Sequence, residues 1–367
     1  MNYILQICTG AWDAPNYTAQ TIIERIRVIS SKIPVDRVII GWSTDAGLYK
    51  EVGSFLHKQG IRMMLWLPCL SEISGIAQPD ETRDVFGNEI ITPLKQPGED
   101  FVFCCPSSSR NIKIVESLYE QYFSDCGFDG VFLDKIRGQS FVSGVPGVLS
   151  CGCERCQQAF LERGVDLNDV RMLYEEKGDA FFDMRSFPMS GEFELEEPVA
   201  QRFFEAKEEI IAATVLELCD YFKDKGLIVG LDLFAPLVSR FVGQNYRLIT
   251  EKADFIKPML YRRTEAPAGI GYEYALFKKY APAARKGAAP VMDRAFLYTQ
   301  LEAVGKVSCE RYPGIEINYL EDIARTDAEY VRKSLSAVKS FGFEGAALCW
   351  NVMEAPDEHI EAIANLT

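Results

Sequence analysis

Three acidic residues, Asp134, Asp232 and Glu316, lie within or at the ends of apolar runs that are typical of buried strands. A carboxyl group in such a place is costly to bury unless it is paired or hydrogen-bonded, and burial shifts its pKa toward values useful for acid–base chemistry. Hydrolysis of a glycosidic bond needs two such groups, a proton donor and a nucleophile or base. We therefore expect these three acids to form a catalytic set, against the alternative that each pairs with a basic residue for structural reasons.

The four tryptophans lie at or just after the ends of four apolar runs. Flat side chains that are apolar and also donate a hydrogen bond suit a ligand with CH-rich faces, of which a sugar ring is the commonest example. Indoles that merely cap a core are the alternative. We expect a carbohydrate-binding platform made of Trp12, Trp42, Trp66 and Trp350.

Four polar residues follow other runs and are expected to contact sugar hydroxyls: Arg137, Gln244, Tyr261 and Asn351. A less favoured alternative is a lyase or aldolase that uses Lys135 as a Schiff-base nucleophile. Lys257 shares a strand face with Tyr261 but lies about 13 Å deeper, which argues against the same role for it. Glu354 is a weaker candidate for a catalytic acid.

A cysteine motif, Cys151-Gly-Cys153-Glu-Arg-Cys156, puts three thiols within six residues. Three thiolates at this spacing can bind one zinc ion if a fourth ligand comes from elsewhere, and Cys105 or Cys104 could supply it. We expect a structural zinc, with a loop of free cysteines as the alternative. No catalytic cofactor is expected.

The elements that must position these residues alternate regularly along the chain. Short apolar runs rich in β-branched and aromatic residues are separated by segments with helical spacing, which predicts a parallel α/β sheet. The predicted strands are 3–8, 37–42, 61–67, 130–135, 227–233, 255–261, 314–319 and 345–350. The predicted helices are 18–31, 45–59, 111–126, 196–225, 326–341 and 357–365.

Eight strands with intervening helices predict a (β/α)8 TIM barrel that forms a single domain over 1–367. A doubly wound open sheet is the alternative, but the glycine-rich phosphate turn typical of its first strand is missing from the sequence. Two intervals, at about 68–109 and 136–196, are too long for a plain loop and helix. Because they follow strands three and four, we expect these insertions to shape a cleft at the barrel face where active sites form.

The composition disfavours several classes of binding partner and of catalytic site. The 367 residues carry a formal net charge of −14, so a nucleic acid or an anionic membrane surface would repel the chain. Only two histidines are present, which disfavours multi-histidine metallohydrolases and Ser–His triads. The N-terminus does not resemble a secretory signal, and the 11 cysteines, several of them in apolar runs, fit a reducing compartment. We expect a cytoplasmic location; the oligomeric state stays open.

The segment Gly127-Phe-Asp-Gly-Val-Phe-Leu-Asp-Lys-Ile-Arg137, followed by the cysteine motif, resembles the strand-four signature of glycoside-hydrolase-like TIM-barrel proteins. The resemblance extends to segments 105–107, 230–236, 243–246 and 257–261. It implies a barrel fold, a carbohydrate ligand and catalysis by Asp134 with the acids of strands five and seven. Chitinase-type sequences would place an acid at position 136, where this chain has Ile136, so that chemistry is disfavoured. A non-catalytic carbohydrate-binding barrel is the other alternative.

Overall fold

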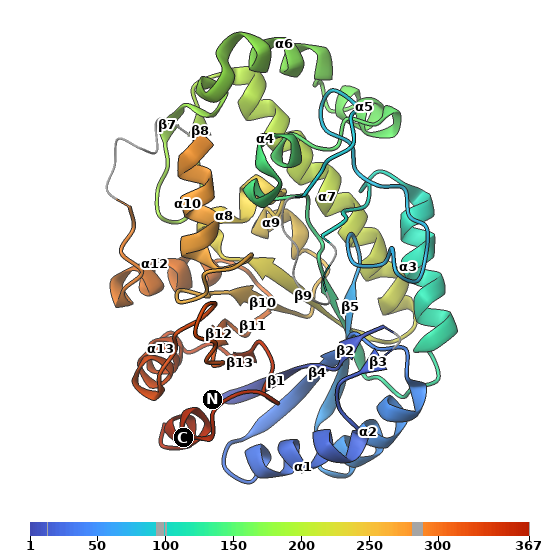
Figure 1. Ribbon diagram of the computed structural model, residues 1–367, viewed down its shortest axis with the longest axis vertical. Helices are drawn as coiled ribbons and strands as arrows, with labels where there is room; N and C mark the ends of the chain where they lie inside the picture. The colour runs from blue at the N-terminus through green and yellow to red at the C-terminus, as the bar shows by residue number, and fades with distance from the viewer. Residues whose placement is uncertain (13, 93–98, 100, 281–288, 367) are drawn as a thin grey trace.

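The computed structural model describes residues 1–12, 14–92, 99, 101–280 and 289–366. Its centre is a closed barrel of eight parallel strands, which confirms the predicted (β/α)8 architecture (Figure 1). Each strand pairs with the next, and the last, β13, pairs with β1 to close the ring. The strands are β1 (Asn2–Cys8), β4 (Val35–Gly41), β5 (Arg62–Pro68), β6 (Gly130–Asp134), β9 (Ile228–Phe234), β10 (Phe255–Met259), β12 (Gly314–Glu316) and β13 (Gly345–Cys349).

The strands are almost wholly buried because one face fills the barrel and the other meets the helices. Six predicted strands end within one residue of the observed end, whereas the seventh is shorter than expected: β12 stops at Glu316, three residues before Tyr319. A short strand β11 (Glu310–Arg311) pairs with the start of β10 just before β12 begins.

Helices surround the barrel, and their apolar stripes are buried against the strands or against neighbouring helices and loops. Side-chain oxygens cap several N-termini, for example Thr18 and Asp45. Gly60 and Gly226, with positive φ angles of 70° and 76°, end two of the helices. The long helices are α1 (Ala19–Ser30), α2 (Ala46–Lys58), α3 (Ser109–Tyr122), α7 (Pro198–Asp224), α10 (Ile270–Tyr280), α12 (Arg294–Val304), α13 (Ala328–Ser340) and α14 (Asp357–Ala364).

The two insertions follow β5 and β6 as predicted, and both lie beyond the carboxyl ends of the strands. The second contains most of the extra structure, namely η1 (Phe141–Ser143), α4 (Gly144–Val148), α5 (Glu154–Leu161), α6 (Leu167–Lys177), η2 (Gly178–Phe182) and the hairpin β7 (Met184–Ser186) with β8 (Glu194–Leu195). Shorter elements are β2 (Gly10–Ala11), β3 (Ala14–Pro15), α8 (Pro236–Ser239), η3 (Arg240–Val242) and α9 (Tyr246–Ile249). Among the described residues, none of these helices combines the length and apolarity needed to cross a bilayer.

Candidate active site and cysteine cluster

A cavity of about 620 Å³ opens at the carboxyl ends of the barrel strands. Every barrel strand, or the loop that follows it, contributes to the lining. This is the face at which TIM-barrel enzymes build their active sites. The charged residues that line it are Glu99, Asp134, Lys135, Arg137, Asp232, Lys257 and Glu354.

Asp134 is the last residue of β6, and its carboxylate is fixed in orientation. Its Oδ2 accepts a hydrogen bond from Trp66 Nε1 at 2.8 Å, and its Oδ1 accepts one from the Lys135 backbone N–H. The side chain is buried but lines the cavity. Two of the predicted site residues, the acid and the indole, are therefore in direct contact.

Asp232 lies at the level of Asp134 on the neighbouring strand. Leu133 of β6 and Leu231 of β9 are register partners, and the two aspartates are the residues that follow them. Burial raises the pKa of Asp232 to about 7, and the nearby Asp134 carboxylate adds to the rise while Lys257 opposes it. Both acids line the same cavity.

Lys257 is the ion-pair partner of Asp232. Its Nζ lies 2.8 Å from Asp232 Oδ2 and donates to Tyr261 Oη at 3.0 Å, and both pair members are almost completely inaccessible to solvent. The contact with Tyr261 confirms that the lysine shares that residue's face. Asp232 Oδ1 has no hydrogen-bond partner among the described residues. The sequence reasoning named both residues but did not foresee this pair, because partners on neighbouring strands are visible only from strand register.

Glu316 is placed apart from the two aspartates. It does not line the cavity; its Oε1 accepts hydrogen bonds from Tyr330 Oη of helix α13 at 2.9 Å and from the Arg263 backbone N–H at 2.6 Å. Its exposed fraction is 0%, and burial raises its pKa to about 7. The expectation that all three acids converge is thus met by two of them only.

The aromatic residues divide into two groups around the mouth. Trp42 stacks on Trp12 with ring centroids 6.3 Å apart and meets Trp66 edge-on at 5.7 Å. Trp350 packs edge-on against Tyr261 with centroids 6.4 Å apart. All of these except Trp12, which lies against Trp42 and donates to the Glu72 carbonyl, line the cavity.

Lys135 and Arg137 are held by the first insertion and by β9. Lys135 Nζ lies 2.7 Å from Glu99 Oε2 and 3.5 Å from Glu72 Oε1. Burial alone would lower the pKa of this lysine, but the two glutamates raise it, which disfavours the neutral amine that a Schiff-base nucleophile needs. The Arg137 guanidinium is sandwiched 4.6 Å from the Phe103 ring and 4.4 Å from the Phe234 ring.

Asn351, Glu354 and Gln244 differ in what they offer a ligand. Asn351 and Glu354 line the cavity, and Glu354 Oε1 accepts a hydrogen bond from Tyr17 Oη at 2.8 Å. The Gln244 amide instead accepts from Phe234 N at 2.7 Å and donates to the carbonyl oxygens of Ile136 and Asp232. Gln244 therefore braces the ends of two strands from outside the cavity, rather than facing a sugar as the sequence led us to expect.

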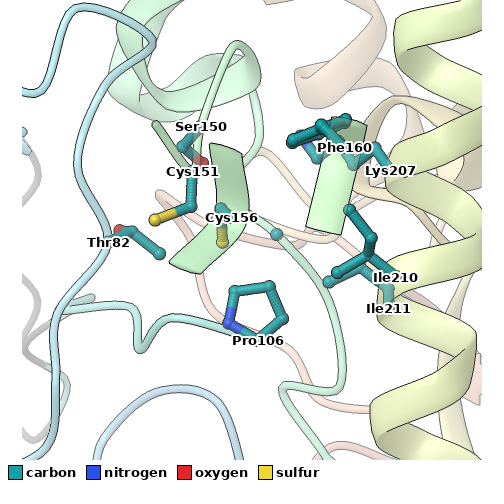
Figure 2. Close-up of a pocket in the computed structure, with 10 residues that line it drawn as sticks. Thr82, Pro106, Ser150, Cys151, Cys156, Phe160, Lys207, Ile210 and Ile211 are labelled. Atoms are coloured by element: carbon teal, nitrogen blue, oxygen red, sulfur yellow. The ribbon is translucent and has the colours of Figure 1, made fainter. Parts of the chain in front are cut away.

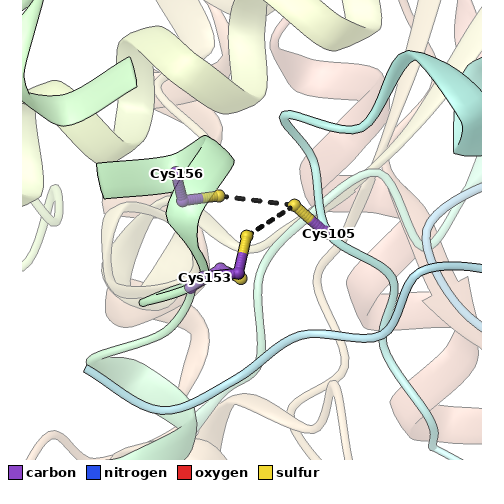
Figure 3. Close-up of side chains that lie close together, drawn as sticks. Cys105, Cys153 and Cys156 are labelled. Carbon is purple, nitrogen blue, oxygen red and sulfur yellow. Dashed lines mark hydrogen bonds between the residues drawn. The ribbon is translucent and has the colours of Figure 1, made fainter. Parts of the chain in front are cut away.

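The four predicted cysteines meet where the two insertions touch. All four sulfur atoms lie within 4.8 Å of one another, and Cys105 Sγ is 3.4 Å from both Cys153 Sγ and Cys156 Sγ (Figure 3). These separations exceed a disulfide bond and approach the edge of about 3.8 Å expected for a tetrahedron with Zn–S bonds of about 2.3 Å. Cys104 instead packs with Ile73 and Leu118. The cluster consists of Cys105, Cys151, Cys153 and Cys156.

A small cavity of about 10 Å³, room for about one water molecule, lies behind this cluster against helix α7 (Figure 2). Cys151, Cys156 and Lys207 contribute to its lining. Lys207 Nζ donates to the carbonyl oxygens of Val148 at 2.7 Å and Phe241 at 3.3 Å. Burial lowers the pKa of Lys207 to about 7, and the nearby Cys151 thiol opposes this fall.

Comparison with known proteins shows the fold. No protein-family model matches the chain, and no curated protein matches it significantly in sequence. The glycoside hydrolase domain of PgaB (BpsB) from Bordetella bronchiseptica superposes with a TM-score of 0.64 at 14% identity, covering 99% of this chain and 98% of that domain. A C-terminal domain of a putative chitinase from Desulfitobacterium hafniense gives a TM-score of 0.52 at 11% identity, covering 98% of both chains.

An α-L-fucosidase from Paenibacillus thiaminolyticus gives a TM-score of 0.57 at 10% identity; the match covers 99% of this chain but 48% of the fucosidase. The chain spans about half the length of that enzyme. These similarities show that the chain shares its TIM-barrel fold with glycoside hydrolase domains, the fold that the strand-four resemblance implied.

Proposed function

We propose that the protein is a glycoside hydrolase that cleaves a glycosidic bond by carboxyl acid–base chemistry. The observation that carries this proposal is the placement of Asp134 and Asp232 at one level of neighbouring strands in one cavity. The glycoside-hydrolase-like fold and the aromatic groups at the mouth support it, because they provide flat apolar surfaces for sugar rings.

Asp134 is proposed as the nucleophile or base and Asp232 as the proton donor. With its pKa raised to about 7, Asp232 is largely protonated below neutral pH, and its Oδ1 has no hydrogen-bond partner within the described part of the chain. The separation of the two carboxyl groups sets the anomeric outcome, because retaining enzymes use about 5 to 5.5 Å and inverting ones about 6.5 to 9.5 Å. Glu316, bonded to Tyr330, is the less suitable donor.

The test is hydrolysis of a panel of α- and β-aryl glycosides and short oligosaccharides by the wild type and by Asp134→Asn and Asp232→Asn. We expect turnover to fall at least about 100-fold in each variant. Glu316→Gln and the exposed Asp220→Asn serve as matched controls that keep activity. NMR of the first-formed product gives the anomeric outcome. If the wild type binds sugars without turnover, the protein is a carbohydrate-binding barrel instead.

We also propose that the cysteine cluster holds a structural zinc ion. The four sulfurs are the complete ligand set of a closed tetrahedral site, which leaves no position for substrate. Its function would be to join the two insertions. Elemental analysis of the purified protein should give one zinc per chain, reduced in Cys153→Ser and retained in Cys309→Ser, which replaces a half-buried cysteine outside the cluster. A metal-free wild type would contradict the proposal.

A further inference from the structure

One side of the cavity is apolar. Five lining residues there are apolar, Ala266, Pro267, Ala268, Leu320 and Ile323, and we call them the apolar wall; Thr264 of the same loop also lines the cavity. None of the five wall side chains carries a polar atom, and Leu320 remains 37% exposed. The charged lining residues come instead from other strands and loops around the mouth. The cavity therefore presents two different chemistries to a ligand.

The apolar wall is a built surface, because backbone hydrogen bonds join the loops after β10 and β12. Glu265 N donates to Ile323 O at 2.6 Å, and Leu320 and Ala324 exchange backbone hydrogen bonds of 3.0 and 2.7 Å. The turn that carries Pro267 is tightly packed, because a Cβ atom on Gly269 would lie only 1.9 Å from the Thr264 carbonyl oxygen. The backbone of the apolar wall is thus held in place without a ligand, with Leu320 exposed and the other four side chains half-buried.

The strand order places the apolar wall on the Asp232 side of the two acids. Going round the barrel, β6 carries Asp134, β9 carries Asp232, and the loops after β10 and β12 carry the wall. A proton donor faces the leaving-group oxygen, and the nucleophile or base acts on the sugar carbon. The group released with that oxygen would therefore point toward the wall, while the sugar ring lies toward the tryptophans of β4 and β5.

We propose that the natural substrate carries an apolar aglycone, an aryl or alkyl group, that packs against the apolar wall. This inference rests on the proposed function and names its substrate class. A second sugar ring is the poorer occupant, because its hydroxyl groups would lose water against side chains that cannot hydrogen-bond to them. An apolar group gains free energy in the same place, since the wall and the group both leave water.

The test uses methyl, propyl and hexyl glycosides of one sugar, whose alcohols differ little in acidity. We expect kcat/KM to rise with chain length by up to about fourfold per methylene. Leu320→Ser and Ile323→Ser should flatten this rise, whereas Met172→Ser, at an exposed apolar residue on α6, should not. Hydrolysis of the corresponding glycosyl fluoride, which has no aglycone to pack, should be unchanged in all three variants.

Calorimetric binding of the same glycosides to Asp134→Asn separates the two proposals. If affinity rises with chain length and Leu320→Ser abolishes this rise, the apolar wall is supported. If in addition no glycoside is hydrolysed, only the hydrolase proposal fails. Binding and turnover that are insensitive to chain length overturn the wall. A disaccharide that outperforms the hexyl glycoside, with a dependence on Leu320, would also overturn it in favour of a sugar aglycone.

Discussion

The Asp232–Lys257 pair and the cysteine cluster are two polar assemblies held in different ways. The pair lies inside the barrel, on strands whose register fixes it at 2.8 Å. The cluster joins two insertions, and Cys105 is 51 residues from Cys156 along the chain. Strand pairing positions side chains by itself, whereas groups on long loops need a cross-link to stay together. We therefore predict that disrupting the barrel pair mainly lowers the free energy of unfolding. The cysteine cluster should keep its arrangement only while the proposed zinc ion is bound.

Removing the lysine of the barrel pair should have the largest effect. Above pH 7, where the Asp232 carboxyl is ionised, Lys257→Met leaves that charge buried without its ion-pair partner, and we expect the free energy of unfolding to fall by about 3 to 5 kcal/mol in chemical denaturation. The matched control is Lys252→Met, which breaks an exposed, solvent-screened pair with Asp220 and should leave the free energy of unfolding nearly unchanged. The double variant Lys257→Met/Asp232→Leu should recover much of the loss. Equal effects of both lysine substitutions would show that burial does not set the difference.

Loss of the metal should affect the insertions more than the barrel. Closing a loop of this length by a cross-link is worth up to about 4 kcal/mol by chain entropy, so a chelator or Cys153→Ser should lower the thermal transition. Protease cleavage should then start within the insertions. Because Phe101 and Phe103 pack on Lys135 and Arg137 just before Cys105, activity should fall too. An unchanged cleavage pattern after metal removal would refute the cross-link.

Asp232 and Glu316, two buried acids whose pKa values rise to about 7, should make stability depend on pH. For Glu316 the folded-state pKa is about 7, above the value of about 4.5 in an unfolded chain, so the folded state holds the proton more tightly. Its stabilising contribution is complete below about pH 4.5 and is lost as pH rises through 7, by about 2 kcal/mol between pH 5 and 7. Glu316→Gln should remove this part of the slope without changing activity.

For Asp232 the same rise in pKa should appear in catalysis. Turnover should decline above about pH 7 as the proposed donor loses its proton, and Glu316→Gln should leave that limb in place. If the decline in turnover above pH 7 disappears in Glu316→Gln, the proton donor is Glu316, which is bonded to Tyr330, and not Asp232.

Gln244→Ala should have the smallest effect. It distinguishes a structural role of the Gln244 amide from a contact with the sugar. The amide joins Phe234 to the backbone of Ile136, and its removal leaves buried backbone groups unpaired, at a cost of about 1 to 2 kcal/mol in unfolding free energy. KM should stay within about threefold of the wild-type value. A large rise in KM with unchanged stability would restore the predicted sugar contact.

The fold was predictable because its signal is local. Apolar runs of strand length, alternating with amphipathic segments capped by residues such as Asp45 and ended by glycines such as Gly60, require only short-range patterns. Helices α5, α6, α10 and α12 were missed. They have weaker apolar periodicity or are short, and they pack on loops and neighbouring helices rather than repeating the barrel pattern.

The sequence by itself determined the barrel, its insertions and the cysteines able to meet, because apolar periodicity and motif spacing are properties of the chain. Only the tertiary structure decided which acids share a cavity. Asp232 faces Lys257 and the mouth, while Glu316 is bonded to Tyr330. Both are acids in apolar strands of similar composition, so no local pattern separates them. Strand register and the packing of helix α13 do, and those arise only when distant parts of the chain come together.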